Sequence, residues 1–125
     1  MENGNIIGKK VWAIAEGYIP SGSTGPKPDF ESHDTLCVLN TSDQTANLEV
    51  TIYFEDKDPV GPYKMSVPPQ RTKHFRFNEF KDPEEVPRDT DYASKIVSDI
   101  PVVIQYTRLD SRQAENAIFT TIAYS

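Results

Sequence analysis

The middle of the chain reads Leu48-Glu-Val-Thr-Ile-Tyr-Phe-Glu55, and apolar and polar side chains alternate along this stretch. Successive side chains of a β-strand point to opposite faces, so the pattern predicts a strand with one buried face and one wet face. A second alternation covers residues 74–78, where Phe75 and Phe77 lie between polar side chains. The two stretches together favour an antiparallel sheet with one solvated face.

Prolines and turn residues divide the rest of the chain into short apolar runs. The 125 residues include ten prolines, which stop helices because they lack the backbone donor. Turn chemistry occurs at residues 40–44, 56–62 and 68–70, and residues 78–92 form a long acidic connection. The runs predict strands at about 10–16, 34–40, 46–55, 62–67, 71–78, 94–98, 101–108 and 116–124. We therefore expect one domain over residues 1–125, an all-β antiparallel sandwich of about eight strands.

Four of these runs are apolar on both faces: residues 11–15, 36–39, 102–104 and 118–119. A two-layer sandwich leaves one face of each strand in water, so such strands need a second cover. Another copy of the same chain is the commonest cover, because most soluble oligomers are symmetric homo-oligomers. We expect a homo-oligomer; the alternative is a central strand buried under a long loop.

Charge and cysteine usage indicate the compartment and the class of partner. The net charge is −6 and the sequence pI is about 4.8, so the surface repels nucleic acid and anionic lipid at long range. A single cysteine, Cys37, rules out an intrachain disulfide, which fits a reducing compartment. The chain has neither a run of about 18 apolar residues nor a signal-peptide pattern. These features predict a soluble, cytoplasmic protein.

Patterns for catalysis and metal binding are weak. The imidazole and thiol groups belong to His33, His74 and Cys37. His33 and Cys37 lie about 13 Å apart along an extended strand, too far to share one zinc ion. The sequence contains no nucleophile elbow and no glycine-rich phosphate loop. We expect no metal, no cofactor and no enzymatic activity.

A basic cluster occupies one predicted strand, at Arg71, Lys73, His74 and Arg76. Like charges on one strand face favour an anionic or hydroxylated partner. The alternative is a solvated sheet face whose charge is balanced by nearby Asp and Glu side chains.

Two segments predict a polar binding site. The apolar strand that begins at Trp12 ends in Glu16-Gly17-Tyr18, and a carboxylate beside a tyrosine is typical of a pocket rim. The run 102–104 leads into Gln105, Tyr106 and Arg108, where a planar guanidinium lies beside hydrogen-bonding groups. The alternatives are a Glu16 that reaches water and an Arg108 in a structural salt bridge. The candidate ligand-binding residues, for a sugar-like molecule or an organic anion, are Trp12, Glu16, Tyr18, His33, His74, Gln105 and Arg108.

Longer blocks of the chain carry a family resemblance. Residues 12–20, 56–63, 71–74, 90–94, 107–117 and 121–124 resemble the sensory rhodopsin transducer family of cyanobacterial type. The resemblance runs from Trp12 to Tyr124. It implies a small, soluble, cytoplasmic β-sandwich that assembles as a homotetramer and has no enzymatic activity. It also implies association with the cytoplasmic face of a retinal-binding membrane receptor, from which a light signal is relayed.

The resemblance leaves two functions open. The first is a signalling adaptor that contacts a membrane rhodopsin, and the alternative is a small-molecule sensor module without a rhodopsin partner. Relatives of the fold are proposed to bind small molecules, and DNA contact has been suggested for them. The charge of −6 and the lack of a basic tail after Tyr124 argue against DNA contact here. Residues 1–11, 21–28 and 80–88 depart from the family pattern.

Overall fold

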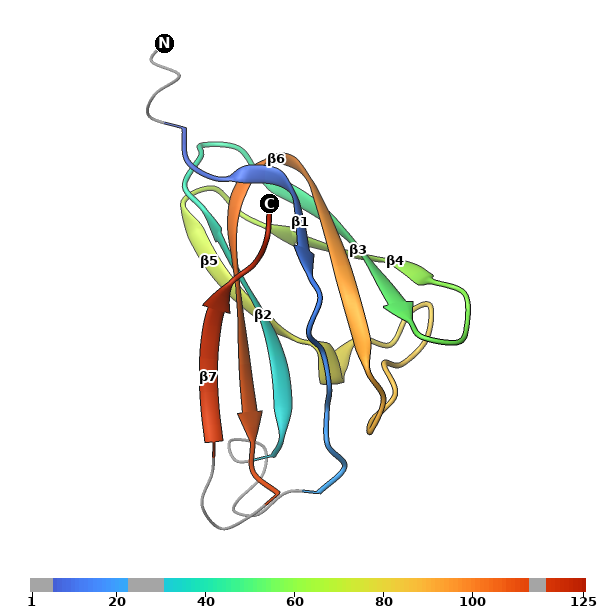
Figure 1. The fold of residues 1–125 in the computed structure, drawn as a ribbon. Helices are drawn as coiled ribbons and strands as arrows, with labels where there is room; N and C mark the ends of the chain where they lie inside the picture. The colour runs from blue at the N-terminus through green and yellow to red at the C-terminus, as the bar shows by residue number, and fades with distance from the viewer. Residues whose placement is uncertain (1–5, 23–30, 113–116) are drawn as a thin grey trace.

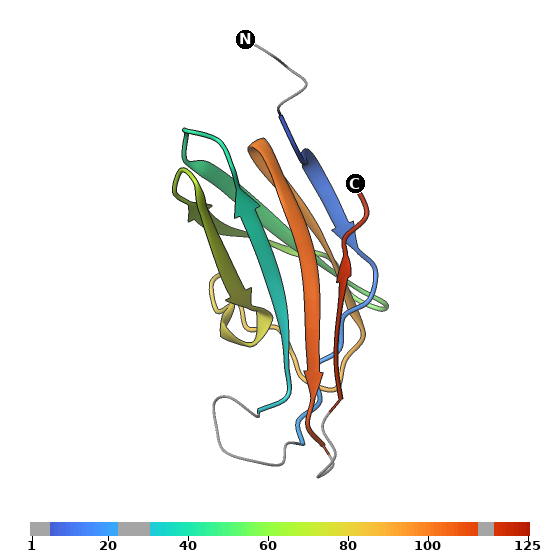
Figure 2. The same cartoon turned by 90° about the vertical axis from the view of Figure 1, so that its left-hand side faces the viewer.

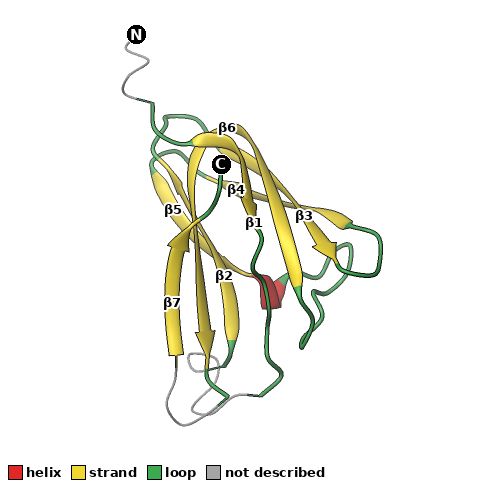
Figure 3. Ribbon diagram, viewed as in Figure 1, coloured by secondary structure: helices red, strands yellow, loops and turns green. Residues whose placement is uncertain are grey.

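The computed structural model describes residues 6–22, 31–112 and 117–125, with the backbone alone for 117–119. Within these ranges the chain forms seven strands and one short 3-10 turn, Phe77–Glu79. Figure 3 shows this turn in red among the yellow strands. The strands are β1 (Lys9–Ile14), β2 (His33–Asn40), β3 (Ala46–Phe54), β4 (Val60–Val67), β5 (Arg71–Arg76), β6 (Tyr92–Asp110) and β7 (Ala117–Ile122). The described part of the chain holds no apolar helix of membrane-spanning length.

β6 is the central element of the fold. Its first half pairs antiparallel with β1 and β3, and its second half pairs antiparallel with β2 and β7. The strand path is β4-β3-β6-β2-β5. Figure 1 shows β6 rising beside β3, bending over and descending beside β2 and β7. The strands therefore form one hydrogen-bonded antiparallel sheet that curls on itself.

The all-β prediction is confirmed, but the number of strands differs. The expected strands 94–98 and 101–108 are two halves of the 19-residue β6, which continues through Pro101. A proline lacks one backbone donor, and the strand tolerates it because it lies where β6 changes partners. The expected strand 71–78 ends at Arg76, and Phe77 lies in the 3-10 turn. Phe77 is nevertheless fully buried and packs against Phe80 and Tyr92 at ring-centroid distances of 4.9 and 5.4 Å.

The alternation of β3 appears in the structure as predicted. Leu48, Val50 and Ile52 are buried in the core, whereas Glu49 and Tyr53 are exposed. The buried set joins side chains from the other strands in one continuous apolar core.

Trp12 fixes the bend of β6. The register of β1 against β6 shifts between the pairs Lys9↔Val102 and Val11↔Val97, so β1 crosses the bend. The Trp12 indole is buried there, and its Nε1–H is shared by the carbonyl oxygens of Lys9 (2.9 Å) and Val102 (3.0 Å). The indole therefore ties the start of β1 to the second half of β6.

Gly8 allows the close approach of the backbones at this bend. Its φ is +96°, and an added Cβ would lie 2.3 Å from the carbonyl oxygen of Val102. Gly8→Ala should therefore lower the free energy of unfolding by about 1–3 kcal/mol, measured by urea denaturation. Gly22→Ala is the matched control, because its Cβ would meet the flexible side chain of Arg112. Equal stabilities of Gly8→Ala and the wild type would show that the approach is not strained.

Part of the outer face of the sheet is apolar and exposed. Val11 and Val97 are paired across β1 and β6 and are 52% and 40% exposed. Leu39 on β2 and Ile122 on β7 are exposed on the other half of the sheet. Val11 and Leu39 belong to the doubly apolar runs 11–15 and 36–39, so the outer sides of these two runs are open to contact with another molecule, whereas the side chains of the run 118–119 lie outside the described residues.

Candidate functional site

A fully buried carboxylate, that of Asp34, lies at one end of the curled sheet. Its Oδ2 accepts hydrogen bonds from the Tyr92 hydroxyl (2.7 Å) and from the backbone N–H of Tyr18 (2.9 Å). Its Oδ1 accepts a hydrogen bond from Nε of Arg108 at 3.1 Å. Burying a carboxylate costs several kcal/mol unless it is paired, so the donors around Asp34 are what makes it tolerable in the core.

Arg108 links this buried carboxylate to the surface. Asp34 and Arg108 are register partners on β2 and β6, which brings their side chains together. Nη2 of Arg108 donates to the Tyr106 hydroxyl at 3.0 Å, and Nη1 lies 3.7 Å from a carboxylate oxygen of Glu16. Glu16 is largely exposed, so solvent screens its pair with Arg108. We call this set the Asp34 cluster: Glu16, Asp34, Tyr92, Tyr106 and Arg108.

Backbone hydrogen bonds hold in place the segment that carries Glu16. The carbonyl oxygen of Gly17 accepts the N–H of Tyr92 at 3.0 Å, and the N–H of Tyr18 donates to Asp34. A Cβ on Gly17 would lie 2.6 Å from the Tyr92 ring, so only glycine fits there without displacing that ring. These contacts place Glu16 at a defined position next to Arg108.

Burial and charge set the protonation of the two tyrosines and of the arginine in the cluster. Burial raises the pKa of Tyr92 well above its usual value, and the negative charge of Asp34 adds to this. The pKa of Tyr106 is raised for the same two reasons, in the same order. Burial by itself lowers the pKa of Arg108, but its hydrogen bond to Asp34 and the charge of that carboxylate outweigh burial and raise it. The cluster therefore contains neutral tyrosines and a charged guanidinium around neutral pH.

Alkaline pH should destabilise the protein through Tyr92. A tyrosine whose pKa is raised by folding contributes stability that is complete below its unfolded pKa of about 10 and is lost as the pH rises toward the folded value. Tyr92 alone should lower the free energy of unfolding by about 1.4 kcal/mol for each pH unit above 10. Urea denaturation at several pH values gives the free energy of unfolding of the wild type and of Tyr92→Phe. The difference between their slopes against pH is the contribution of Tyr92. Parallel curves for the two proteins would contradict it.

The structure brings two of the seven candidate ligand-binding residues, Glu16 and Arg108, into contact, and it places Tyr18 and His33 near them without contact to this pair. Glu16 pairs with Arg108, and Tyr18 follows Glu16 with its ring centroid 6.0 Å from the guanidinium of Arg112. His33 precedes Asp34 in β2, and its Nδ1 lies 2.7 Å from the carbonyl oxygen of Glu31.

The other three candidates lie in different parts of the fold. The Trp12 indole is buried under the bend of β6. Gln105 is exposed on β6, between its register partners Cys37 and Ile122. His74 lies on β5 and lines a groove against β4. Trp12, Gln105 and His74 are therefore not part of the Asp34 cluster.

Sequence reasoning missed Asp34, which organises the cluster. A signal for it exists: Asp34 is in phase with Leu36 and Val38, and all three are buried on one face of β2. A carboxylate at a position whose period-two neighbours are core residues must be paired. Arg108 in turn lies in phase with Tyr106 and Ile104 on the neighbouring strand.

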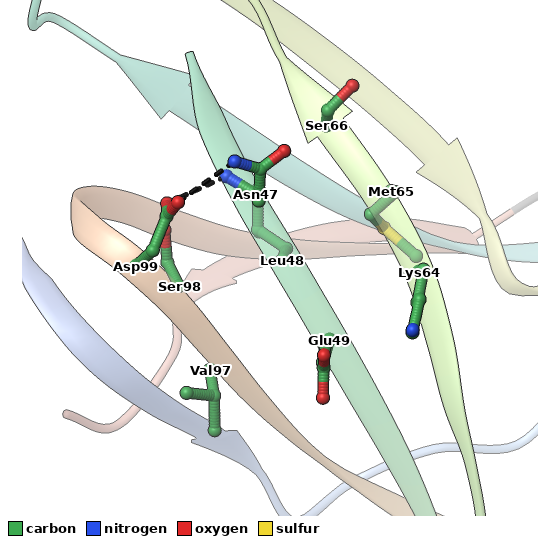
Figure 4. Close-up of a pocket in the computed structure, with 9 residues that line it drawn as sticks. All are labelled: Asn47, Leu48, Glu49, Lys64, Met65, Ser66, Val97, Ser98 and Asp99. Atoms are coloured by element: carbon green, nitrogen blue, oxygen red, sulfur yellow. Dashed lines mark hydrogen bonds between the residues drawn. The ribbon is translucent and has the colours of Figure 1, made fainter. Parts of the chain in front are cut away.

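A separate groove of about 600 Å³ lies across β3, β4 and the first half of β6, and Figure 4 shows it. Asn47 donates to the carboxylate of Asp99 from its backbone N–H (2.8 Å) and from Nδ2 (2.9 Å), which closes one end. Glu49 and Lys64 are register partners across β3 and β4, and Val97 lies beside them. None of the seven candidate residues lines this groove.

Known proteins resemble the whole fold. The family model described as "Anabaena sensory rhodopsin transducer" matches residues 7–125. A solved structure of the Anabaena sensory rhodopsin transducer is 59% identical, with a TM-score of 0.76, and the match covers 86% of this chain and 94% of that one. The solved Thermotoga maritima protein 1070 is 34% identical, with a TM-score of 0.83, over 95% of this chain and 96% of that one. The comparison with curated proteins gives no match.

The family model and the 59% identical structure agree with the blocks noted in the sequence, from Trp12 to Tyr124. On this evidence the chain belongs to the Anabaena sensory rhodopsin transducer family.

Proposed function

We propose that this protein is a signalling adaptor that relays a signal from a retinal-binding membrane receptor through protein–protein contact. The observation that carries the proposal is the family match over residues 7–125 together with a 59% identical structure named as the transducer. We place the protein in the cytoplasm, as a single domain over residues 1–125 without enzymatic activity. We also propose that the two halves of the curled sheet form the two layers of a β-sandwich.

The proposal includes a homo-oligomer, a tetramer by analogy with the family. The exposed pair Val11 and Val97, with Leu39 and Ile122 on the other half of the sheet, supports it. Exposed apolar side chains that cluster on a sheet face are typical of surfaces that contact another protein.

A calorimetric titration tests the receptor contact. The protein is titrated into nanodiscs that hold the rhodopsin encoded in the same genome, and empty nanodiscs of the same lipids are the control. We expect saturable heat with the rhodopsin and none with the empty discs, because the acidic surface does not attract anionic lipid. A genome without a rhodopsin, or equal heats with both kinds of disc, would contradict the proposal.

A small-molecule sensor is the second candidate function. The observation that favours it is the exposed carboxylate of Glu16 at 3.7 Å from the Arg108 guanidinium, two residues before Tyr18, whose ring faces Arg112. These groups suit a sugar-like molecule or an organic anion, since they combine hydrogen-bonding groups with an aromatic face. The candidate site would also include His33, which is adjacent in sequence to Asp34.

A thermal-shift screen of sugars and organic anions tests the sensor. A ligand at 100 times its Kd should add about 2.7 kcal/mol to the stability of the folded state. Glu16→Gln should abolish the shift, whereas Glu49→Gln, an exposed glutamate on β3, should leave it unchanged. A screen without a hit, or a hit that Glu16→Gln leaves intact, would reject this site.

A further inference from the structure

β5 is a basic strand at an edge of the sheet. It reads Arg-Thr-Lys-His-Phe-Arg, with three full positive charges and no carboxylate, in a protein of net charge −6. It ends the strand path, and Figure 2 shows it outermost beside β2. Its register partners on β2 are residues 35–40, none of which is charged. The strand it pairs with therefore does not neutralise β5.

A groove of about 390 Å³ separates β5 from β4, the strand at the other end of the path. Three consecutive residues of each strand line it, 63–65 and 74–76, together with residues 79–82. Phe75 and Met65 are half-buried at the margin of the core, so the groove has an apolar floor. The floor lies between two strand edges rather than inside a closed cavity.

The Lys73 side chain links β5 to β4 next to this groove, just beyond the residues that line it. Its ammonium lies 3.4 Å from the carbonyl oxygen of Ser66 on β4 and 5.9 Å from the ring centroid of Phe75. The ion pairs formed among residues 6–22, 31–112 and 117–125 do not include Lys73 or Arg71. The lining of the groove includes the cations Lys64, Arg76 and Lys81 and the carboxylates Glu79 and Asp82. With Lys73 beside it, the cations outnumber the carboxylates, which favours an occupant that brings carboxylates.

The edge and its charge select the kind of occupant. The outer edge of a strand presents N–H and C=O groups to which a further strand can hydrogen-bond. Two β5 strands from two copies would place like charges opposite each other, which is unfavourable, whereas an acidic strand would be attracted. An open groove between strands also suits an extended peptide better than a small ligand, which needs most of its surface buried.

We propose that β5 binds an extended acidic segment of a soluble partner protein, which adds to the sheet edge as a further strand along the groove. The segment places carboxylates opposite Lys73, His74 and Arg76 and an apolar side chain opposite Phe75. Cytoplasmic loops of membrane proteins are rich in Lys and Arg, so this surface does not suit the receptor. It gives the adaptor a second partner, and it stands independently of the receptor contact.

Fluorescence anisotropy with a dye-labelled, blocked peptide Glu-Val-Glu-Glu-Thr-Glu tests the proposal. We expect saturable binding at about 0.1 M salt that weakens strongly at about 1 M, where the Debye length falls from about 10 to 3 Å. Lys73→Glu should weaken binding about tenfold or more, because an attraction becomes a repulsion. Lys95→Glu is the matched control, since Lys95 is exposed on the first half of β6, and it should bind as the wild type does.

Two further measurements establish strand addition. A peptide with N-methylated backbone amides should not bind, and the unmodified peptide should slow hydrogen exchange of the β5 amides. The proposal is overturned if the peptide does not bind, or if Lys73→Glu binds equally well with an unchanged circular dichroism spectrum. Protection confined to other strands would also overturn it. Protection of β5 in the free protein that rises with protein concentration would assign this edge to a second copy and would overturn it too.

Discussion

Asp34→Ala should lower the free energy of unfolding by about 3–5 kcal/mol, because removing one member of a buried ion pair leaves the other uncompensated. The change leaves the Arg108 guanidinium without its buried counter-charge. It also leaves the Tyr92 hydroxyl and the Tyr18 N–H without their acceptor. Urea denaturation followed by circular dichroism measures the loss.

Two variants sharpen this experiment. Asp34→Asn keeps the shape of the side chain but removes its charge, so its loss should be smaller than that of Asp34→Ala. Asp43→Ala makes the same chemical change at an exposed position of the β2–β3 turn and should stay within about 0.5 kcal/mol of the wild type. An Asp34→Ala protein as stable as Asp43→Ala would show that the cluster does not hold this end of the sheet together.

Trp12→Ala should also cost about 3–5 kcal/mol, because it leaves a cavity where the largest side chain of β1 is buried. Trp12→Phe keeps an aromatic ring but loses the N–H shared by the carbonyl oxygens of Lys9 and Val102. Its smaller loss should include about 1 kcal/mol for that hydrogen bonding. Lys10→Ala, at an exposed position of the same strand, is the control. Equal stability of Trp12→Ala and Lys10→Ala in urea would contradict the role of Trp12 at the bend.

Local patterns predicted the strands because strand formation follows from side-chain alternation and turn chemistry. The alternation in residues 48–55 and the turns at 40–44 and 56–62 gave β3 nearly its observed bounds. The continuity of β6 was not predictable in this way. Pro101 ends a strand in most contexts, and its tolerance depends on the exchange of neighbours between the two halves of β6.

The candidate site was predicted only in part, because local patterns identify residue types but not contacts between distant segments. Glu16 and Arg108 were singled out by residue type, but their approach to 3.7 Å depends on the curl of the sheet and the backbone bonds of Gly17 and Tyr18. Asp34 was overlooked because a carboxylate at the start of a strand usually reaches water. Its phase with Leu36 and Val38 is the local clue that it is buried instead.

The proposed relay of a signal requires more than contact between this protein and a receptor. A partner that binds two states of a receptor equally cannot distinguish them, so the affinity must differ between the dark and the illuminated rhodopsin. The direct measurement is the Kd of this protein for the reconstituted rhodopsin of the same genome, in the dark and under continuous light. We expect binding whose Kd changes reproducibly with illumination. An unchanged Kd, or no binding in either state, would contradict the proposed relay.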